Sequence, residues 1–218
     1  MRLEIGGVER VFAPEVLVVI GYAGRDRAAV EHHIDELAEL GVPRPASIPL
    51  YMAFPPGLVS QAPSITVAGG ETSGEAEIAV AVDGGEAFVT LGSDHTDRAL
   101  EAVDIVASKG VCPKPVALTG WPAGVVGDRW DDLVLRSRID GDALYQDGSA
   151  AANLHPLELV AAIPWVGRPP GCFVAFTGTV PVIGGIRPST GFRAELSGPG
   201  LAEIELSYRV ETVPPLAG

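Results

Sequence analysis

Three acidic residues, Glu75, Glu77 and Asp94, have the types and the spacing that metal chemistry needs. They flank two strand-like runs joined by Gly84-Gly85, a pair typical of a two-residue hairpin turn. With the turn at these glycines Glu75 lies opposite Asp94, and because side chains alternate along a strand all three carboxylates share one face. Like charges opposed in a sheet repel, so this convergence indicates a cation, and hard oxygen ligands suit Mg²⁺, Mn²⁺ or Ca²⁺.

The other face of this predicted hairpin is apolar and is expected to lie on the core. Its residues are Ala76, Ile78, Val80, Val82, Ala87, Val89 and Leu91. Two alternatives stay open. A turn at Asp83-Gly84 would place Glu75 opposite Gly92 and leave Asp94 beyond the paired strands. The three carboxylates could also form no more than a solvated acidic face on a hairpin.

The composition indicates one folded domain, since 218 residues that are 47% hydrophobic can bury a sizeable core. The formal net charge of −13 argues against binding to nucleic acid or to anionic membranes, both of which need basic patches. No stretch approaches the ~20 apolar residues of a membrane span, and residues 1–7 lack a signal-peptide core. Cys112 and Cys172 make neither a disulfide framework nor a zinc set. We therefore expect a cytoplasmic protein.

The 27 glycines and 19 prolines favour many short strands over long helices. Strands are predicted over 2–5, 8–12, 16–20, 50–54, 75–83, 86–92, 116–118, 133–139, 143–146, 172–177, 191–197 and 203–211, with a loop over 121–130. Helices are predicted over 27–40, 96–108 and 156–163, with stops at Gly41 and Gly110 and an N-cap at Asp94 or Thr96. The absence of strand–helix alternation indicates an α+β, mostly β protein with a rolled or sandwiched sheet.

From Glu75 onward the chain resembles the fumarylacetoacetate hydrolase superfamily. Five elements carry the resemblance, in the superfamily's order, within about residues 48–210. They are Glu75-Ala-Glu77; Ser93-Asp94 with Arg98; Ser108-Lys109-Gly110 followed by Cys112-Pro113; Tyr145-Gln146-Asp147-Gly148; and Phe176-Thr177-Gly178-Thr179. The resemblance implies a mixed β-sheet roll over residues 1–218. Within it, 1–70 would hold N-terminal strands and a lid helix, and 71–211 the metal-binding core.

The resemblance also implies a homodimer and a Mg²⁺ or Mn²⁺ ion held by Glu75, Glu77 and Asp94, which could stabilise the enolate of a 2-oxo acid. It implies further that Lys109 reaches the substrate or an oxyanion and that Arg98 binds a substrate carboxylate.

Gln146 and Thr179 are expected, by the same resemblance, to contact the substrate. Plainer interpretations stay open for these four residues. Lys109 could be solvated at a helix end, and Arg98 could pair with Glu101 or Asp94. Gln146 could be an ordinary hairpin side chain, and Thr179 a turn residue.

A general base is harder to place. Members of the superfamily carry a His and a Glu on a short lid helix soon after an Asn-Tyr, whereas here only Tyr22 matches and the histidines come later. His33 and Glu36 lie at i, i+3 and could act as a base and its orienting carboxylate. His32 with Asp35 or Glu36 is an alternative, and a plain polar helix face is another.

These features predict a metal-dependent enzyme that hydrolyses a C–C bond of a 2,4-dioxo acid or acylpyruvate through a metal-bound enolate. A decarboxylase, hydratase or isomerase of a related oxo acid stays open, as does a non-catalytic metal- or ligand-binding relative. The Glu-x-Glu to Asp spacing is short for the superfamily, and the segment Tyr51-Met-Ala-Phe-Pro55-Pro56 lacks its usual Lys. Both departures indicate a divergent branch.

Overall fold

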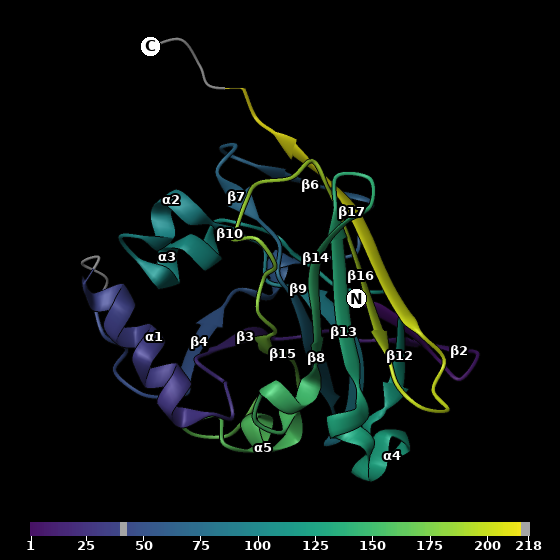
Figure 1. Ribbon diagram of the computed structural model, residues 1–218. Coiled ribbons are helices and arrows are strands. Elements are labelled where there is room, and N and C mark those ends of the chain that lie inside the picture. Colours follow the sequence, from purple (N-terminus) through teal and green to yellow (C-terminus); the bar gives the residue numbers. More distant parts are fainter. Residues whose placement is uncertain (40–42, 215–218) are drawn as a thin grey trace.

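Two β-sheets packed against each other form the body of the protein (Figure 1). The computed structural model describes residues 1–39 and 43–214, without the side chains of His33 and Leu37. Within them the larger sheet has eight strands, in the order β2 (Val8–Val11), β1 (Arg2–Ile5), β12 (Thr119–Pro122), β9 (Glu86–Ser93), β8 (Ala76–Asp83), β15 (Cys172–Thr179), β3 (Val16–Gly21) and β4 (Leu50–Phe54). The smaller sheet runs β14 (Ala143–Ser149), β13 (Val134–Ile139), β16 (Gly191–Ser197), β17 (Ile204–Thr212) and β6 (Ser64–Val67).

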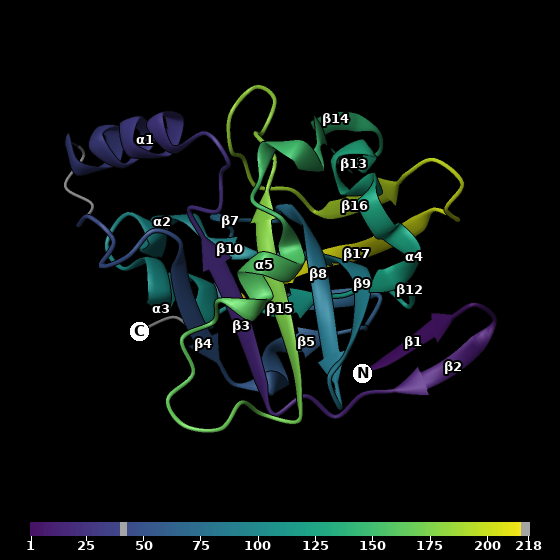
Figure 2. The ribbon, with the colours of Figure 1, turned by 90° about the horizontal axis from the view of Figure 1, so that it is seen from below.

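Short elements complete the described part of the chain. Two small ribbons pair β7 (Thr72–Ser73) with β10 (Thr96–Asp97) and β5 (Val59–Ser60) with β11 (Lys114–Pro115). The α-helices are α1 (Arg27–Glu39), α2 (Arg98–Glu101), α3 (Ile105–Gly110), α4 (Ala123–Val126) and α5 (Pro156–Ala161), with 3-10 turns at Pro56–Leu58, Gly127–Asp132 and Ala150–Ala152. None of these helices is long and apolar enough to cross a membrane. In Figure 2 the hairpin β1–β2 lies at one end of the large sheet and α1 beyond the other.

The hairpin β8–β9 has the predicted register. Asp83 pairs with Glu86 and Glu77 with Gly92, and the Asp94 amide donates to the Glu75 carbonyl at 2.9 Å. Gly84 and Gly85 both have positive φ values, 58° and 88°, as a type I′ turn requires. The alternative turn at Asp83-Gly84 is therefore wrong.

Both faces of β8–β9 are buried, which the sequence did not reveal. One face, with Ile78 and Leu91, packs against the smaller sheet in the main core, as expected from its apolar pattern. The face that carries the acidic residues also holds Ala79, Ala81 and Phe88 in a second apolar cluster, to which β3 and β4 of the same sheet contribute side chains. A solvated acidic face is therefore excluded, because the carboxylates at its end emerge from the protein interior.

The helix predicted over residues 96–108 is wrong, since the segment is broken into β10, α2 and α3. Asp97 rather than Asp94 or Thr96 caps α2, by accepting from the Leu100 amide. Asp104 caps α3 by accepting from the Val106 and Ala107 amides, so a second carboxylate starts a new helix where one helix was expected.

Other boundaries also differ. The strand expected at 116–118 is replaced by β11 and β12 on either side of it, and the loop expected at 121–130 contains α4 and a 3-10 turn. The remaining strands agree to within a few residues, as do helices α1 and α5. The stop expected at Gly41 lies outside the described residues.

Gly92 is expected to be intolerant of any side chain, because a Cβ there would overlap the ring of Phe176, which comes from β15 of the same sheet. We predict that Gly92→Ala lowers the free energy of unfolding by about 1–3 kcal/mol, as overpacking of a buried site does. Gly124→Ala, whose Cβ would meet open space in α4, is the matched control and should be neutral or slightly stabilising. Denaturant unfolding of both variants measures the difference, and equal effects would contradict the packing argument.

Candidate active site

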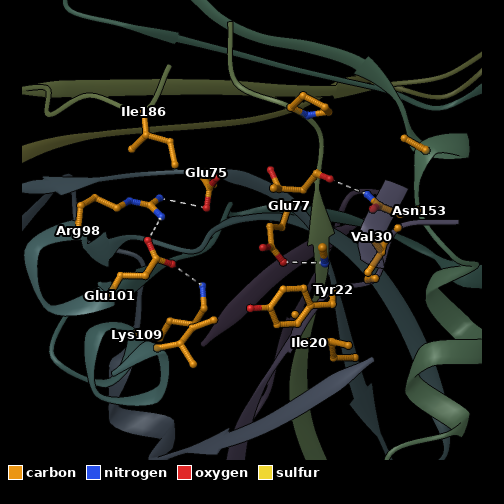
Figure 3. A pocket seen from close by; sticks show the side chains of 18 of the residues that line it. Ile20, Tyr22, Val30, Glu75, Glu77, Arg98, Glu101, Lys109, Asn153 and Ile186 are labelled. Carbon is orange, nitrogen blue, oxygen red and sulfur yellow. Dashed lines mark hydrogen bonds and ion pairs between the residues drawn. The ribbon is translucent and has the colours of Figure 1, made fainter. Parts of the chain in front are cut away.

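A pocket of about 700 Å³ opens where β3, β8 and β15 end, next to α1, α2 and α3 (Figure 3). Its wall combines charged groups with apolar ones. The lining residues are Ile20, Gly21, Tyr22, Ala23, Gly24, Val30, Glu75, Glu77, Arg98, Glu101, Ala102, Ile105, Lys109, Ala152, Asn153, Gly178, Thr179, Pro181 and Ile186. Four of the expected site residues (Glu75, Glu77, Arg98 and Lys109) are thus brought together with Thr179 around one cavity.

Glu77 is the buried carboxylate at the centre of this wall. Its side chain is only 4% exposed, and its Oε2 accepts a hydrogen bond from the Gly178 amide at 2.8 Å. That amide is free to point at Glu77 because β15 bulges between Phe176 and Thr179, with Gly178 at a φ of 99° that suits glycine. Burial raises the pKa of Glu77 well above its usual value, and the charge of Asp94 raises it further.

Asp94 lies behind the wall, held between two lysines. Its Oδ2 is 2.5 Å from Lys109 Nζ and its Oδ1 is 3.0 Å from Lys114 Nζ. Burial opposes ionisation of Asp94, but the two ammonium groups outweigh it and hold the pKa of this carboxyl below its usual value. Burial likewise disfavours the charged form of Lys109, but Asp94 and nearby glutamates outweigh it and keep the pKa of Lys109 above its usual value.

Arg98 links two further carboxylates. Its Nη1 donates to Glu101 Oε2 at 2.7 Å and its Nε to Ser73 Oγ at 2.7 Å, while its Nη2 lies 3.0 Å from Glu75 Oε2. Arg98 Nη2 is itself buried and has Glu75 as its ion-pair partner, so two carboxylates and a serine hydroxyl hold the guanidinium in place.

These groups form a chain of alternating charge. It runs Glu75, Arg98, Glu101, Lys109, Asp94 and Lys114, with Lys109 Nζ 4.0 Å from Glu101 Oε1. With Glu77 added and all groups ionised, four carboxylates face three cations, which leaves one net negative charge. Glu77 is the carboxylate that stands outside this chain of ion pairs.

The donor set suits a hard divalent cation in its chemical type, although two donors already have basic partners. No group of three or more His, Cys, Asp or Glu side chains within residues 1–39 and 43–214 is arranged so that it could hold a metal ion. The reason is visible in the ion pairs, since Arg98 holds Glu75 and two lysines hold Asp94. A carboxylate oxygen has two lone pairs, so it can accept a hydrogen bond from a lysine with one and coordinate a metal with the other. Glu77 makes no ion pair with a lysine or arginine among the described residues, and joint ligation of a cation by Glu75, Glu77 and Asp94 stays a prediction.

Gln146 does not reach the pocket, contrary to the expectation that it contacts the substrate. It is fully buried, and its oxygen accepts from the Ala76 amide and from Ser137 Oγ. Its nitrogen donates to Thr179 Oγ and to the Val180 carbonyl, so every part of the amide is used to join the two sheets. Gln146 is therefore a structural residue that holds the strand carrying Thr179.

Thr179 lines the pocket, but its hydroxyl is also engaged. The hydroxyl donates to the Ala76 carbonyl at 2.7 Å and accepts from Gln146 at 2.7 Å. Thr179 therefore shapes the wall beside Glu77, and its hydroxyl proton is turned away from a ligand.

The expected lid dyad is not assembled at the pocket by the described side chains. His32 is 76% exposed, and its Nε2 lies 3.4 Å from Glu36 Oε1, on the solvent side of α1. The His33 side chain lies outside the described part of the structure, so its pairing with Glu36 stays a prediction. Among the described side chains of α1, Val30 lines the pocket.

Sequence reasoning missed three contributors to this site. Lys114 is fully buried on Asp94 and had no motif to mark it; burial lowers its pKa, which the charge of Asp94 partly offsets. Glu101 was considered only as a partner of Arg98, a spacing of i, i+3 that did signal the contact. Tyr22, which has a positive φ of 56°, turns its ring into the pocket (Figure 3). Such strained residues occur often at functional sites.

Comparison with known proteins assigns this architecture. The structure resembles a protein of Oleispira antarctica provisionally assigned as a fumarylacetoacetate isomerase/hydrolase, with 21% identity, a TM-score of 0.67, and coverage of 97% of this chain and 99% of that one. It also resembles a protein of Burkholderia cenocepacia provisionally assigned as a fumarylpyruvate hydrolase, with 20% identity, a TM-score of 0.67, and coverage of 98% and 95%. A third, a 5-carboxymethyl-2-hydroxymuconate delta-isomerase of Mycobacterium smegmatis, has 16% identity, a TM-score of 0.62, and coverage of 96% and 85%.

The protein therefore has the fumarylacetoacetate hydrolase fold, and the resemblance stated from the sequence is confirmed at that level, including its mostly β class. Within this fold, residues 20–208 match a family model described as a protein of unknown function, DUF2848, and the chain belongs to that family. A search of curated proteins finds no match. Membership of a family of unknown function agrees with the divergence expected from the sequence.

The buried pairing of Lys114 with Asp94 is predicted to be essential for stability. Lys114→Met keeps the length of the side chain but leaves Asp94 with one buried partner fewer, so we expect the free energy of unfolding to fall by about 3–5 kcal/mol. Arg10→Met, which breaks the exposed pair with Glu86, is the control and should change it by less than about 1 kcal/mol. Denaturant unfolding measures both, and a small effect of Lys114→Met would contradict this role.

Proposed function

We propose that the protein is a divalent-cation-dependent enzyme that hydrolyses a C–C bond in a small 2,4-dioxo acid or acylpyruvate. The observation that supports this most is the presence, in the same cavity, of the Arg98 guanidinium and of Glu77, a buried carboxylate that makes no ion pair with a lysine or arginine among the described residues. An anion and a cation that enter together would pair with these two groups. The fold shared with hydrolases and isomerases agrees with an enzyme of this kind.

Each pocket residue has a role in this proposal. Arg98 would donate to the substrate carboxylate. Lys109, fixed by Asp94 and Glu101, would lie near the keto oxygen and stabilise negative charge there. Glu75 and Glu77, with Asp94 behind them, would hold Mg²⁺ or Mn²⁺, or alternatively Ca²⁺, and the bound ion would supply Lewis-acid polarisation of the oxo acid.

The bond changes balance with water as the co-reactant. Water adds to the distal carbonyl carbon and gives up a proton to a base, for which His33 oriented by Glu36 is the proposed candidate. The C–C bond then breaks, and its electron pair passes to the 2-oxo group of the leaving oxo acid, which is protonated at carbon. The products are a carboxylic acid and a shorter 2-oxo acid.

Isomerisation of an oxo acid is the second candidate, because it needs proton transfer at carbon but no water. The raised pKa of Glu77 favours it, since a carboxyl that holds a proton beside the cavity could return that proton to a substrate carbon. The muconate isomerase with the same fold performs chemistry of this type. Decarboxylation, hydration and a non-catalytic relative remain weaker alternatives, and a cytoplasmic homodimer is part of the proposal that light scattering and localisation would test.

Binding of the cation gives the first test. We expect Mg²⁺ or Mn²⁺ to raise the Tm of the chelator-treated protein, by an amount equivalent to about 2.7 kcal/mol at a concentration of 100 Kd. Glu77→Gln should abolish this shift and, because it removes a buried charge, should leave the metal-free protein at least as stable as the unmodified one. Glu9→Gln, an exposed carboxylate, is the control. A full metal shift in Glu77→Gln would refute the assigned site.

The reaction gives the second test. We expect a screen of acylpyruvates, oxaloacetate and related oxo acids with Mg²⁺ or Mn²⁺ to find turnover that a chelator removes. Arg98→Lys should raise KM by roughly 10–100-fold, since a charge-assisted hydrogen bond contributes about 1.5–3 kcal/mol. Arg136→Lys, whose side chain pairs with Asp147 on the surface, should leave KM unchanged. An unaltered KM in Arg98→Lys would show that Arg98 does not bind the substrate.

A further inference from the structure

Charged side chains are unevenly distributed over the wall of the pocket. In Figure 3 its charged groups Arg98, Glu101 and Lys109 lie on one side of Glu77, whereas Ile20 and Val30 lie on the other. The latter come from the end of β3 and from α1. The side of the pocket at Ile20 and Val30 is here called the apolar end.

Among the side chains that the structure describes, which do not include that of His33 on α1, none at the apolar end is a cation that could hold a second carboxylate. Arg98 and Lys109 are the cationic side chains among the lining residues, and both lie on the charged side, where carboxylates hold them. Arg25 follows the lining residue Gly24, but its side chain makes a bidentate pair with Asp131, at 2.7 and 2.9 Å, instead of lining the pocket.

Arg187, which follows the lining residue Ile186, is also turned away. Its Nη1 donates to the carbonyls of Ile183 and Gly185, and its guanidinium lies over the ring of Tyr145. Neither this arginine nor Arg25 lines the cavity.

The polar groups near the apolar end are neutral. Asn153 donates its amide to the Thr179 carbonyl at 2.9 Å, so that donor is occupied. Burial raises the pKa of the Tyr22 hydroxyl, and the charges of Glu101 and Lys109 act on it, so this hydroxyl lies toward the charged side. A carboxylate placed at the apolar end would lose its water without gaining a charged partner.

We propose that the substrate carries a single carboxylate, at its oxo-acid head, and a neutral alkyl or aryl tail that lies in the apolar end beside Ile20 and Val30. This inference rests on the proposed function for the position of the head. It goes further by excluding substrates whose tail ends in a second carboxylate. A cavity of about 700 Å³ is of ordinary size for a small organic ligand, so a tail of several carbons fits beside the head.

A pair of substrates that differ only at the tail end tests this directly. Hexanoylpyruvate and adipoylpyruvate have acyl chains of equal length, and the second ends in a carboxylate. With Mg²⁺ present, we expect kcat/KM for hexanoylpyruvate to be higher by 100-fold or more. Equal values, or a preference for adipoylpyruvate, would overturn the assignment of the tail while leaving the proposed reaction intact.

Val30 provides the matched variants. Val30→Arg places a cation at the apolar end and should raise kcat/KM for adipoylpyruvate relative to hexanoylpyruvate by at least 10-fold. Val30→Met, which changes size but adds no charge, should keep the original preference. If both variants shift the ratio equally, the apolar end does not receive the tail and the proposal fails.

A binding measurement separates the failure of the tail assignment from the failure of the proposed function. Calorimetric titration of the Mg²⁺-treated protein with each compound reports affinity whether or not turnover occurs. Tighter binding of hexanoylpyruvate without cleavage would support the neutral tail and reject the hydrolase reaction. Binding of neither compound would reject both.

Discussion

Burial of acidic side chains on the inner face of the β8–β9 hairpin is the constraint on which the rest of the site depends. Glu77 and Asp94 emerge from a sheet whose two faces are both covered, so their charges need partners within the protein. Asp94 has two lysines, and Glu77 has one backbone amide. Asp94 is therefore stabilised as an anion, whereas a bound cation or a proton would stabilise Glu77.

The break between α2 and α3 brings cationic side chains to these acidic residues. In a continuous helix from residue 96, Arg98 and Lys109 would face the same side but lie about 16 Å apart along the axis, at a rise of about 1.5 Å per residue. The caps at Asp97 and Asp104 instead end one short helix and start another. As a result Arg98 reaches Glu75, just before β8, and Lys109 reaches Asp94, just after β9, within one cluster. The bulge in β15 likewise turns the Gly178 amide toward Glu77, to which it donates.

Features that depend on neighbouring residues could be predicted from the sequence, whereas features that depend on contacts between distant segments could not. The hairpin register depended on two glycines and on alternation, both local, and it is as expected down to the pairing of Glu77 with Gly92. The ordered motifs indicated the superfamily. They also predicted that Arg98 and Lys109 belong to one site, and both side chains line the same pocket. Lys114 and Gln146 could not be assigned in this way. Their places depend on long side chains that reach across layers, and only the packed structure shows that Gln146 is used up in joining sheets.

The net charge of the pocket relates the proposed cation to the number of carboxylates that the proposed substrate can carry. With all groups ionised the cluster carries one net negative charge, so an anionic oxo acid alone would increase the imbalance in a site of low dielectric. A divalent cation together with a monocarboxylate brings the cluster to neutrality, whereas a dicarboxylate would leave it negative again. In the proposed reaction the ion and the substrate head would therefore be coupled through Glu77, which makes no ion pair with a lysine or arginine among the described residues. The same charge count agrees with the proposed metal at the charged side and with a tail without charge at the apolar end.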